Sequence, residues 1–183
     1  MLMLEQRIQQ QFFESADLQY QTAESLSRPL VQAAAALLGT ITGGGKVLVH
    51  GCGQAAALAA HVQDLLIGRF ERERPPLAAL AVTAPRAVAQ LQALGQPGDA
   101  LLLLDAGDAA AALEAVDAAH EKEMTVVALT GLAEPALRER LGEADVLISV
   151  PHERAIRVLE TQLLALHCLC DAIDLQLMGE QGP

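Results

Sequence analysis

Five short, mostly apolar runs alternate with longer helical stretches through most of the chain. Runs that are apolar at almost every position are typical of strands buried on both faces of a parallel sheet. Alternation of strand and helix indicates right-handed β–α–β units, so the sequence predicts a three-layer α/β domain. The expected strands cover residues 46–50, 77–82, 100–104, 124–129 and 145–150.

Helical periodicity flanks these strands at both ends of the chain. Apolar residues repeat every three or four positions over 3–25 and predict a first helix. Ser27 and Pro29 are typical of an N-cap and a first-turn proline, so a second helix is expected over 28–42. A long apolar helix is expected over 153–178. Together these helices carry more apolar surface than one face of a sheet can bury, which favours oligomerisation.

The composition limits what the chain can bind. Its 183 residues fit one domain, with a helical extension over 1–42 and an α/β core with a long C-terminal helix over 43–183. A net charge of −11 and 2% aromatic residues argue against direct contact with nucleic acid or an anionic membrane, because both need a basic surface. No apolar run reaches the length of a membrane span, and the three cysteines form no disulfide framework. We therefore expect a cytoplasmic protein.

The loop after the first expected strand has the frame of an anion site. Gly51, Cys52 and Gly53 lie between a strand and an Ala-rich helix, where glycine lets backbone N–H groups approach a ligand. Gln54 and then alanines follow, so no Ser or Thr hydroxyl completes a phosphate cradle. Cys52 could be a reactive thiolate near a helix N-terminus, although a small buried residue is the commoner outcome there.

Several strings of residues together resemble one family. They are Gly51-Cys52-Gly53, Gly68-Arg69-Phe70-Glu71-Arg72-Glu73-Arg74-Pro75-Pro76-Leu77 and Leu166-His167-Cys168-Leu169-Cys170-Asp171-Ala172-Ile173-Asp174. Over nearly its whole length the chain resembles the SIS (sugar isomerase) domain family, in the branch of the sedoheptulose-7-phosphate isomerases and DiaA, closer to DiaA. The resemblance implies a flavodoxin-like, five-stranded parallel sheet with a helical N-terminal extension. It also implies a homotetramer built as a dimer of dimers.

Both phosphate loops depart from the pattern of that family. The first lacks the usual Asn and the phosphate-binding Ser, and the second carries two Asp residues in place of hydroxyls. Two carboxylates repel a phosphate and cannot donate hydrogen bonds to it. Asp108 could instead cap the helix that follows it, and either role disfavours a phosphate ligand. We interpret the two loops as the remnant of a ligand pocket made of Gly51, Cys52, Gly53, Gln54, Asp105, Gly107 and Asp108.

The proton-transfer residues that the resemblance implies are incomplete. In the family a Glu follows a His by four residues on the first-loop helix, and another His lies on the last helix; here these positions hold His61, Leu65 and His167. Asp64 is adjacent, but it lies about 100° round the helix. Two imidazoles beside Leu65 and Leu159 do not make a zinc site, so we expect no metal and no cofactor. His61, Asp64 and His167 are interpreted as remnants, with the two imidazoles half-buried at a subunit interface.

A further loss concerns the cover of the pocket. The stretch that closes over the sugar in the family, after the second strand, is largely missing between Thr83 and Leu91. Catalysis that requires exclusion of water loses its lid as a result.

These losses together favour a non-catalytic scaffold. By its resemblance to DiaA, the chain is predicted to bind the replication initiator DnaA in several copies, through a surface that includes Leu177 and Met178. Those two residues could equally close the last helix onto the core. Two alternatives remain. One is an isomerase that uses His61, Asp64 and His167 as an acid–base set, and the other is a regulatory module that binds sugar phosphates without converting them.

Overall fold

Five parallel strands form the sheet expected from the sequence. The computed structural model describes residues 1–132 and 135–179. Its strands follow the order β2-β1-β3-β4-β5, and every neighbouring pair is parallel. They are β1 (Val47–Cys52), β2 (Ala79–Val82), β3 (Ala100–Asp105), β4 (Thr125–Thr130) and β5 (Val146–Ser149). The predicted strands and the flavodoxin-like α/β class are confirmed.

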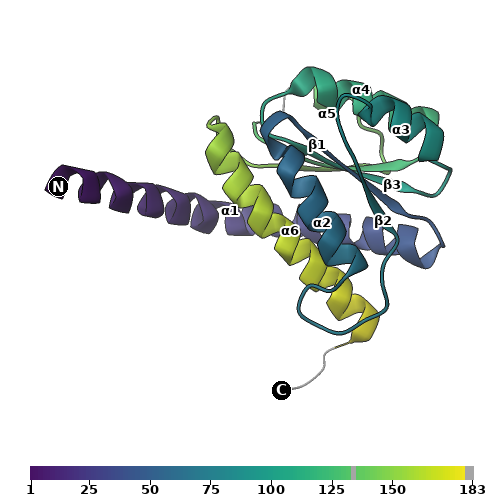
Figure 1. Cartoon of the computed structure of the whole chain (residues 1–183), viewed down its shortest axis with the longest axis horizontal. Coiled ribbons are helices and arrows are strands. Elements are labelled where there is room, and N and C mark those ends of the chain that lie inside the picture. Colours follow the sequence, from purple (N-terminus) through teal and green to yellow (C-terminus); the bar gives the residue numbers. More distant parts are fainter. Residues whose placement is uncertain (133–134, 180–183) are drawn as a thin grey trace.

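Helices cover both faces of this sheet and make three layers (Figure 1). One face is covered by α1 (Leu2–Thr42), α2 (Ala56–Ile67) and α6 (Ala155–Met178), and the other by α3 (Ala87–Leu94), α4 (Ala109–Glu121) and α5 (Pro135–Arg140). Successive strand residues enter opposite cores, so Leu102 packs with the first set of helices and Leu101 with the second. None of the helices in the described ranges is both long and apolar enough to cross a bilayer.

The N-terminal part of the chain is one helix and not two. α1 continues over 41 residues with Pro29 inside it. Ser27 Oγ donates to the main-chain oxygen of Ala23 instead of capping a new helix. A proline removes one helical N–H group, while Leu26 and Ala33 on either side of it are buried in the core. The predicted break was wrong because this packing outweighs the local signal.

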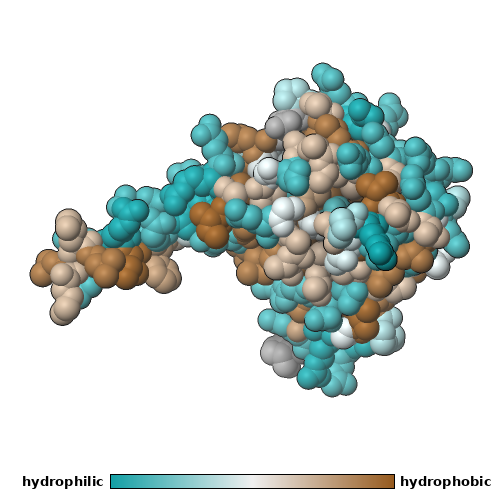
Figure 2. Space-filling model, turned by 45° about the horizontal axis from the view of Figure 1, so that its top comes forward, coloured by the Kyte–Doolittle hydropathy of each residue, from teal (hydrophilic) through white to brown (hydrophobic). Residues whose placement is uncertain are grey.

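The first part of α1 projects from the body of the molecule (Figure 1). Its apolar side chains are exposed, with Leu4, Ile8 and Phe12 at 63%, 51% and 73%. Figure 2 shows apolar residues gathered at this projecting end. Further along, α1 packs against α6 and the sheet.

The carboxyl ends of β1 and β3 bring the two predicted phosphate loops together. Cys52 at the end of β1 is in register with Asp105 at the end of β3. A Cβ built on Gly53 would lie 3.6 Å from the Cβ of Asp108. The strand order reverses between β1 and β3, and such a switch point is where open α/β sheets bind ligands. The connection from β2 to α3 consists only of residues 83–86, so no lid follows β2.

Candidate active site

The loop after β1 needs its glycines. A Cβ on Gly51 would meet the main-chain oxygen of Ala55 at 2.3 Å, so only glycine fits there. Gly53 has a φ of +53° and opens a single 3-10 turn, η1, which ends at Ala55. Gln54 is exposed on this turn, and α2 follows directly. The loop thus presents the N-terminus of a 12-residue helix at the carboxyl edge of the sheet.

The loop after β3 is closed by its own carboxylates. Asp105 Oδ1 accepts hydrogen bonds from the backbone N–H groups of Gly107, at 3.0 Å, and Asp108, at 2.7 Å. Asp108 Oδ1 accepts from the N–H of Ala111 at 3.3 Å, and the predicted N-cap role of Asp108 on α4 is confirmed. Three N–H groups of this loop thereby bond within the loop, and its two carboxylates repel a phosphate, so the loop is a poor phosphate cradle.

Cys52 is a buried thiol and not a thiolate. Burial, and then the charges of Asp105 and Asp108, raise the pKa of Cys52 to about 12. The structure therefore supports the role of Cys52 as a small buried residue and not as a reactive thiolate.

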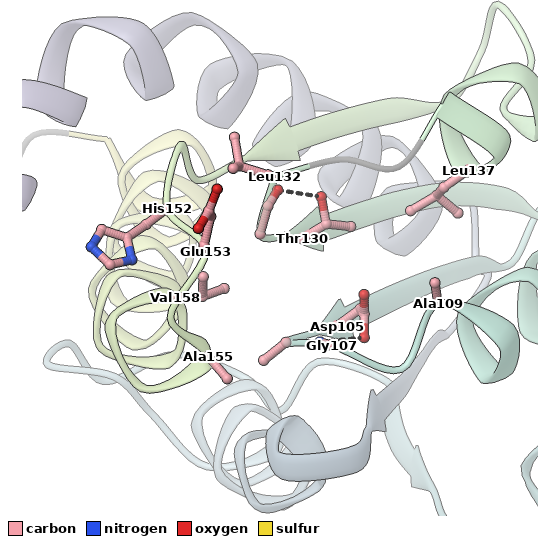
Figure 3. A pocket seen from close by; sticks show the side chains of 12 residues that line it. Asp105, Gly107, Ala109, Thr130, Leu132, Leu137, His152, Glu153, Ala155 and Val158 are labelled. Atoms are coloured by element: carbon pink, nitrogen blue, oxygen red, sulfur yellow. Dashed lines mark hydrogen bonds between the residues drawn. The ribbon is translucent and has the colours of Figure 1, made fainter.

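A cavity of about 150 Å³ lies beside the second loop. Asp105 and Gly107 lie across it from His152 and Glu153, which precede α6, and Thr130 comes from the end of β4 (Figure 3). The charged groups among the described lining residues are carboxylates, with no Lys or Arg. Carboxylates accept hydrogen bonds from hydroxyl groups. The cavity therefore suits the hydroxyls of a sugar better than a phosphate.

Two histidines that are distant in the sequence meet between α2 and α6. Nε2 of His61 lies 3.0 Å from Nε2 of His167, and the two half-buried rings meet edge to face at a centroid distance of 5.3 Å. At this distance one imidazole donates its N–H to the lone pair of the other. The structure thus brings together two of the three predicted acid–base residues, whereas the third, Asp64, is exposed on α2.

Phe70 also packs against His167. It lies on the loop after α2, and its ring centroid is 5.5 Å from that of His167. Burial, and then the charge of His61, lower the pKa of His167 below its ordinary value. A neutral imidazole at physiological pH keeps a lone pair that can accept a proton.

The surroundings of the pair do not fit a zinc ion. Leu65 follows His61 by one helical turn, and Leu159 precedes His167 by about two; both leucines pack against the core. Leucine offers no ligand atom, and zinc sites take three or four protein ligands. Within residues 1–132 and 135–179, no three His, Cys, Asp or Glu side chains come together as a metal-binding group. The donor set is two imidazoles, too few for zinc.

Sequence reasoning missed two buried polar contacts that hold α6 in place. Gln162, which is fully buried, bonds to the main chain at the ends of β3 and β4. Arg74 forms a buried ion pair with Asp174. Arg74 and Asp174 are 100 positions apart, so no local spacing predicts their contact.

A family model described as the SIS domain matches residues 11–131. The chain belongs to the SIS-domain family. This confirms the family expected from the sequence motifs.

Known relatives match this SIS-domain chain over nearly their whole length. It is 52% identical to the phosphoheptose isomerase of Methylibium petroleiphilum over 195 residues, which cover 98% of each chain. It is 41% identical to the phosphoheptose isomerase of Azoarcus sp. over 94% of this chain and 96% of the relative. The solved structure of a phosphoheptose isomerase from Neisseria gonorrhoeae matches with a TM-score of 0.85 and 35% identity, covering 93% of this chain and 98% of that one. The alignment of 195 positions exceeds the 183 residues of this chain, so the Methylibium relative has residues that this chain lacks.

The interpretation as a DiaA-like, non-catalytic scaffold for DnaA was wrong. Relatives at 40–52% identity carry the name phosphoheptose isomerase, and so do two matching solved structures at 35% and 36% identity. The loss of side chains from the two loops leaves the fold and the histidine pair in place. Leu177, expected on the DnaA surface, packs against the core, and Met178 is partly exposed at the end of α6.

Proposed function

We propose that this chain is a sugar-phosphate isomerase that interconverts a ketose and an aldose, with a phosphoheptose as its substrate. The observation that carries this proposal is the 3.0 Å contact between the Nε2 atoms of His61 and His167. The names of the relatives, which share 40–52% of their residues with this chain, support the substrate class.

The reaction needs a group that accepts a proton and a group that donates one. Conversion of the ketose removes a proton from C1 and adds one to the carbonyl oxygen at C2, which gives an enediol. The enediol then loses the proton of its C1 hydroxyl and gains one at C2, so atoms and electrons balance. In the first half His167, whose pKa is lowered, accepts the C1 proton, and His61 donates to the oxygen. The roles reverse in the second half.

The helix that carries His61 also places the phosphate. The N-terminus of α2 and the preceding turn lie at the carboxyl edge without a side-chain cap, and a helix N-terminus favours an anion. His61 lies five residues beyond the start of α2, or about 7–8 Å along the helix. A seven-carbon chain spans that distance, so its phosphate and its reacting carbons reach the two ends of one site. The loop with Asp105 and Asp108 takes no part in holding the phosphate.

Deuterium exchange tests the proposal. Purified protein in D₂O with sedoheptulose 7-phosphate should incorporate deuterium at C1 and form the aldose, both followed by NMR. His61→Gln and His167→Gln should each lower the rate about 10²–10⁴-fold, the usual contribution of general acid–base catalysis. His120→Gln is the matched control, because His120 pairs with Asp145 at the other edge of the sheet.

Two outcomes decide against the proposal. Turnover that survives in both His61→Gln and His167→Gln would remove the pair from the chemistry. A rise in melting temperature with the sugar phosphate but no exchange at C1 would favour a module that binds sugar phosphates without converting them.

A further inference from the structure

The loop between α2 and β2 is held by one buried arginine. The side chain of Arg74 is 1% exposed, and so is that of Asp174 on α6, with 2.5 Å between Nε and Oδ1. A buried arginine whose charge is paired stays fixed in position, because separating the two charges leaves one of them uncompensated. The loop itself has no helix or strand between residues 68 and 78.

The same guanidinium also binds the end of α2. Its Nη2 donates to the main-chain oxygen of Leu65 and its Nη1 to that of Leu66, both at 2.8 Å. No basic residue lies in the last turn of α2, so Arg74 supplies the positive charge that a helix C-terminus favours. One side chain thus joins α2, the loop and α6.

These anchor points lie on the helix faces that carry the histidine pair. Leu65 follows His61 by four residues, which is one turn along the same face of α2. Asp174 follows His167 by seven residues, which is two turns along the same face of α6. Arg74 therefore fixes the separation of α2 and α6 one turn beyond His61 and two turns beyond His167.

Phe70 shares the loop with Arg74 and rests on His167, with ring centroids 5.5 Å apart and the ring planes inclined by 36°. We propose that Arg74, through Asp174, is the positioning residue that holds His61, His167 and Phe70 in register. This proposal rests on the proposed isomerase function, in which the relative position of the two imidazoles determines how the proton is transferred. The side chain of Arg74 is buried and bonded to Asp174 and to the main chain of α2, so Arg74 acts through these contacts.

Fluorine NMR reads the position of Phe70 directly. The chain has three phenylalanines, so 4-fluorophenylalanine gives three signals, of which Phe12 and Phe13 lie on the exposed part of α1. Arg74→Lys keeps a positive charge beside Asp174 but loses the two Nη groups that donate to the main-chain oxygens of Leu65 and Leu66. It should move the Phe70 signal and leave the other two unchanged.

Three further variants separate positioning from general loss of stability. Asp174→Asn keeps the shape of the ion-pair partner of Arg74 but removes its charge, and it should move the Phe70 signal in the same way. Lys46→Met breaks the ion pair between Lys46 and Asp99, which precede β1 and β3, so it lowers stability without removing a hydrogen bond of Arg74 or Asp174. Glu73→Gln, which removes only the exposed pair with Arg69 on the same loop, is the second control.

Kinetics of the same variants complete the test. Arg74→Lys and Asp174→Asn should lower kcat about 10–100-fold, as a misplaced acid–base group does, with KM changed less than about threefold. Lys46→Met and Glu73→Gln should change neither constant. A folded Arg74→Lys protein with the Phe70 signal and kcat of the wild type would overturn the proposal. If the wild type itself shows no turnover, the isomerase function fails, and an unmoved Phe70 signal in both variants would still refute the positioning role by itself.

Discussion

Gln162 in α6 donates from Nε2 to the main-chain oxygen of Asp105, 2.7 Å away at the end of β3. The same nitrogen donates to the main-chain oxygen of Leu129 in β4 at 3.0 Å. One amide therefore joins α6 to the ends of two central strands, beside the loop that the two Asp residues close. Its Oε1 has no hydrogen-bond partner among the described residues.

Replacement of Gln162 by leucine should lower stability markedly. The side chain is fully buried, so Gln162→Leu leaves two buried carbonyl oxygens without this donor, and a loss of about 1–3 kcal/mol in the free energy of unfolding is expected. Urea unfolding measures the change. Gln92→Leu is a matched control, because exposed Gln92 only reaches Glu121, and it should stay within about 0.5 kcal/mol of the wild type. Equal losses of unfolding free energy in the two variants would show that the hydrogen bonds of Gln162 add no stability beyond that of an exposed glutamine.

The strands and the last helix could be predicted because their signals are local. The run from Leu101 to Leu104 is apolar throughout, since alternate side chains enter the cores on the two faces of the sheet. The glycines of the first loop gave an equally local signal, and the steric limits at Gly51 confirm it. Local patterns of this kind depend only on neighbours along the chain.

Contacts over long sequence distances could not be predicted. The join of α1 across Pro29 depends on packing against α6, which local cap and proline signals do not report. The pair of Arg74 and Asp174 depends on two segments meeting in space. The histidine pair was found only because the resemblance named both positions, and its 3.0 Å contact needed the structure.

The stability of the protein should fall as the pH is lowered through the region of histidine titration. Burial, and then the charge of His61, lower the pKa of His167 below the ordinary value of 6.5. The unfolded chain takes up a proton at this position near pH 6.5, whereas the folded chain does so only at lower pH. The unfolded state therefore binds more protons in this window, and the free energy of unfolding decreases as the pH falls.

His167→Gln removes this contribution. The free energy of unfolding of that variant, measured by urea titration at several pH values from about 7 downwards, should depend less steeply on pH than that of the wild type. Parallel curves for the two proteins would mean that folding does not perturb His167.

The three cysteines should differ in reactivity. Burial raises the pKa of both Cys52 and Cys170 to about 12, and both side chains are buried. Cys168 is exposed. Partial burial of its thiol, and then the charge of Asp171, also raise its pKa. Since the thiolate is the reactive form, brief treatment with iodoacetamide at neutral pH should modify Cys168 first and leave the other two until the protein unfolds. Peptide mass spectrometry reports the order, and rapid native labelling of Cys52 would contradict the burial of that loop.

The projecting end of α1 should mediate assembly. Leu4, Ile8 and Phe12 follow one another at four-residue spacing on one face of the helix and are exposed, as Figure 2 shows for the apolar end of this segment. An isolated helical end of this length is marginal in water, and its apolar face favours a partner. We propose that copies of the chain cover one another's α1 and form a homotetramer, a dimer of dimers with closed symmetry.

Light scattering after gel filtration tests this assembly. The wild type should have a mass near four times the 19.3 kDa of one chain. The double variant with Ile8→Glu and Phe12→Glu should have a smaller mass. Far-UV circular dichroism should show that the α/β body is still folded, because neither residue contacts the core. Gln10→Glu, which adds a charge to the same stretch without removing an apolar side chain, should keep the tetramer. If the wild type is monomeric at micromolar concentration, the apolar face of α1 does not mediate self-association. If the double variant stays tetrameric, the interface lies on α6 or elsewhere on the body.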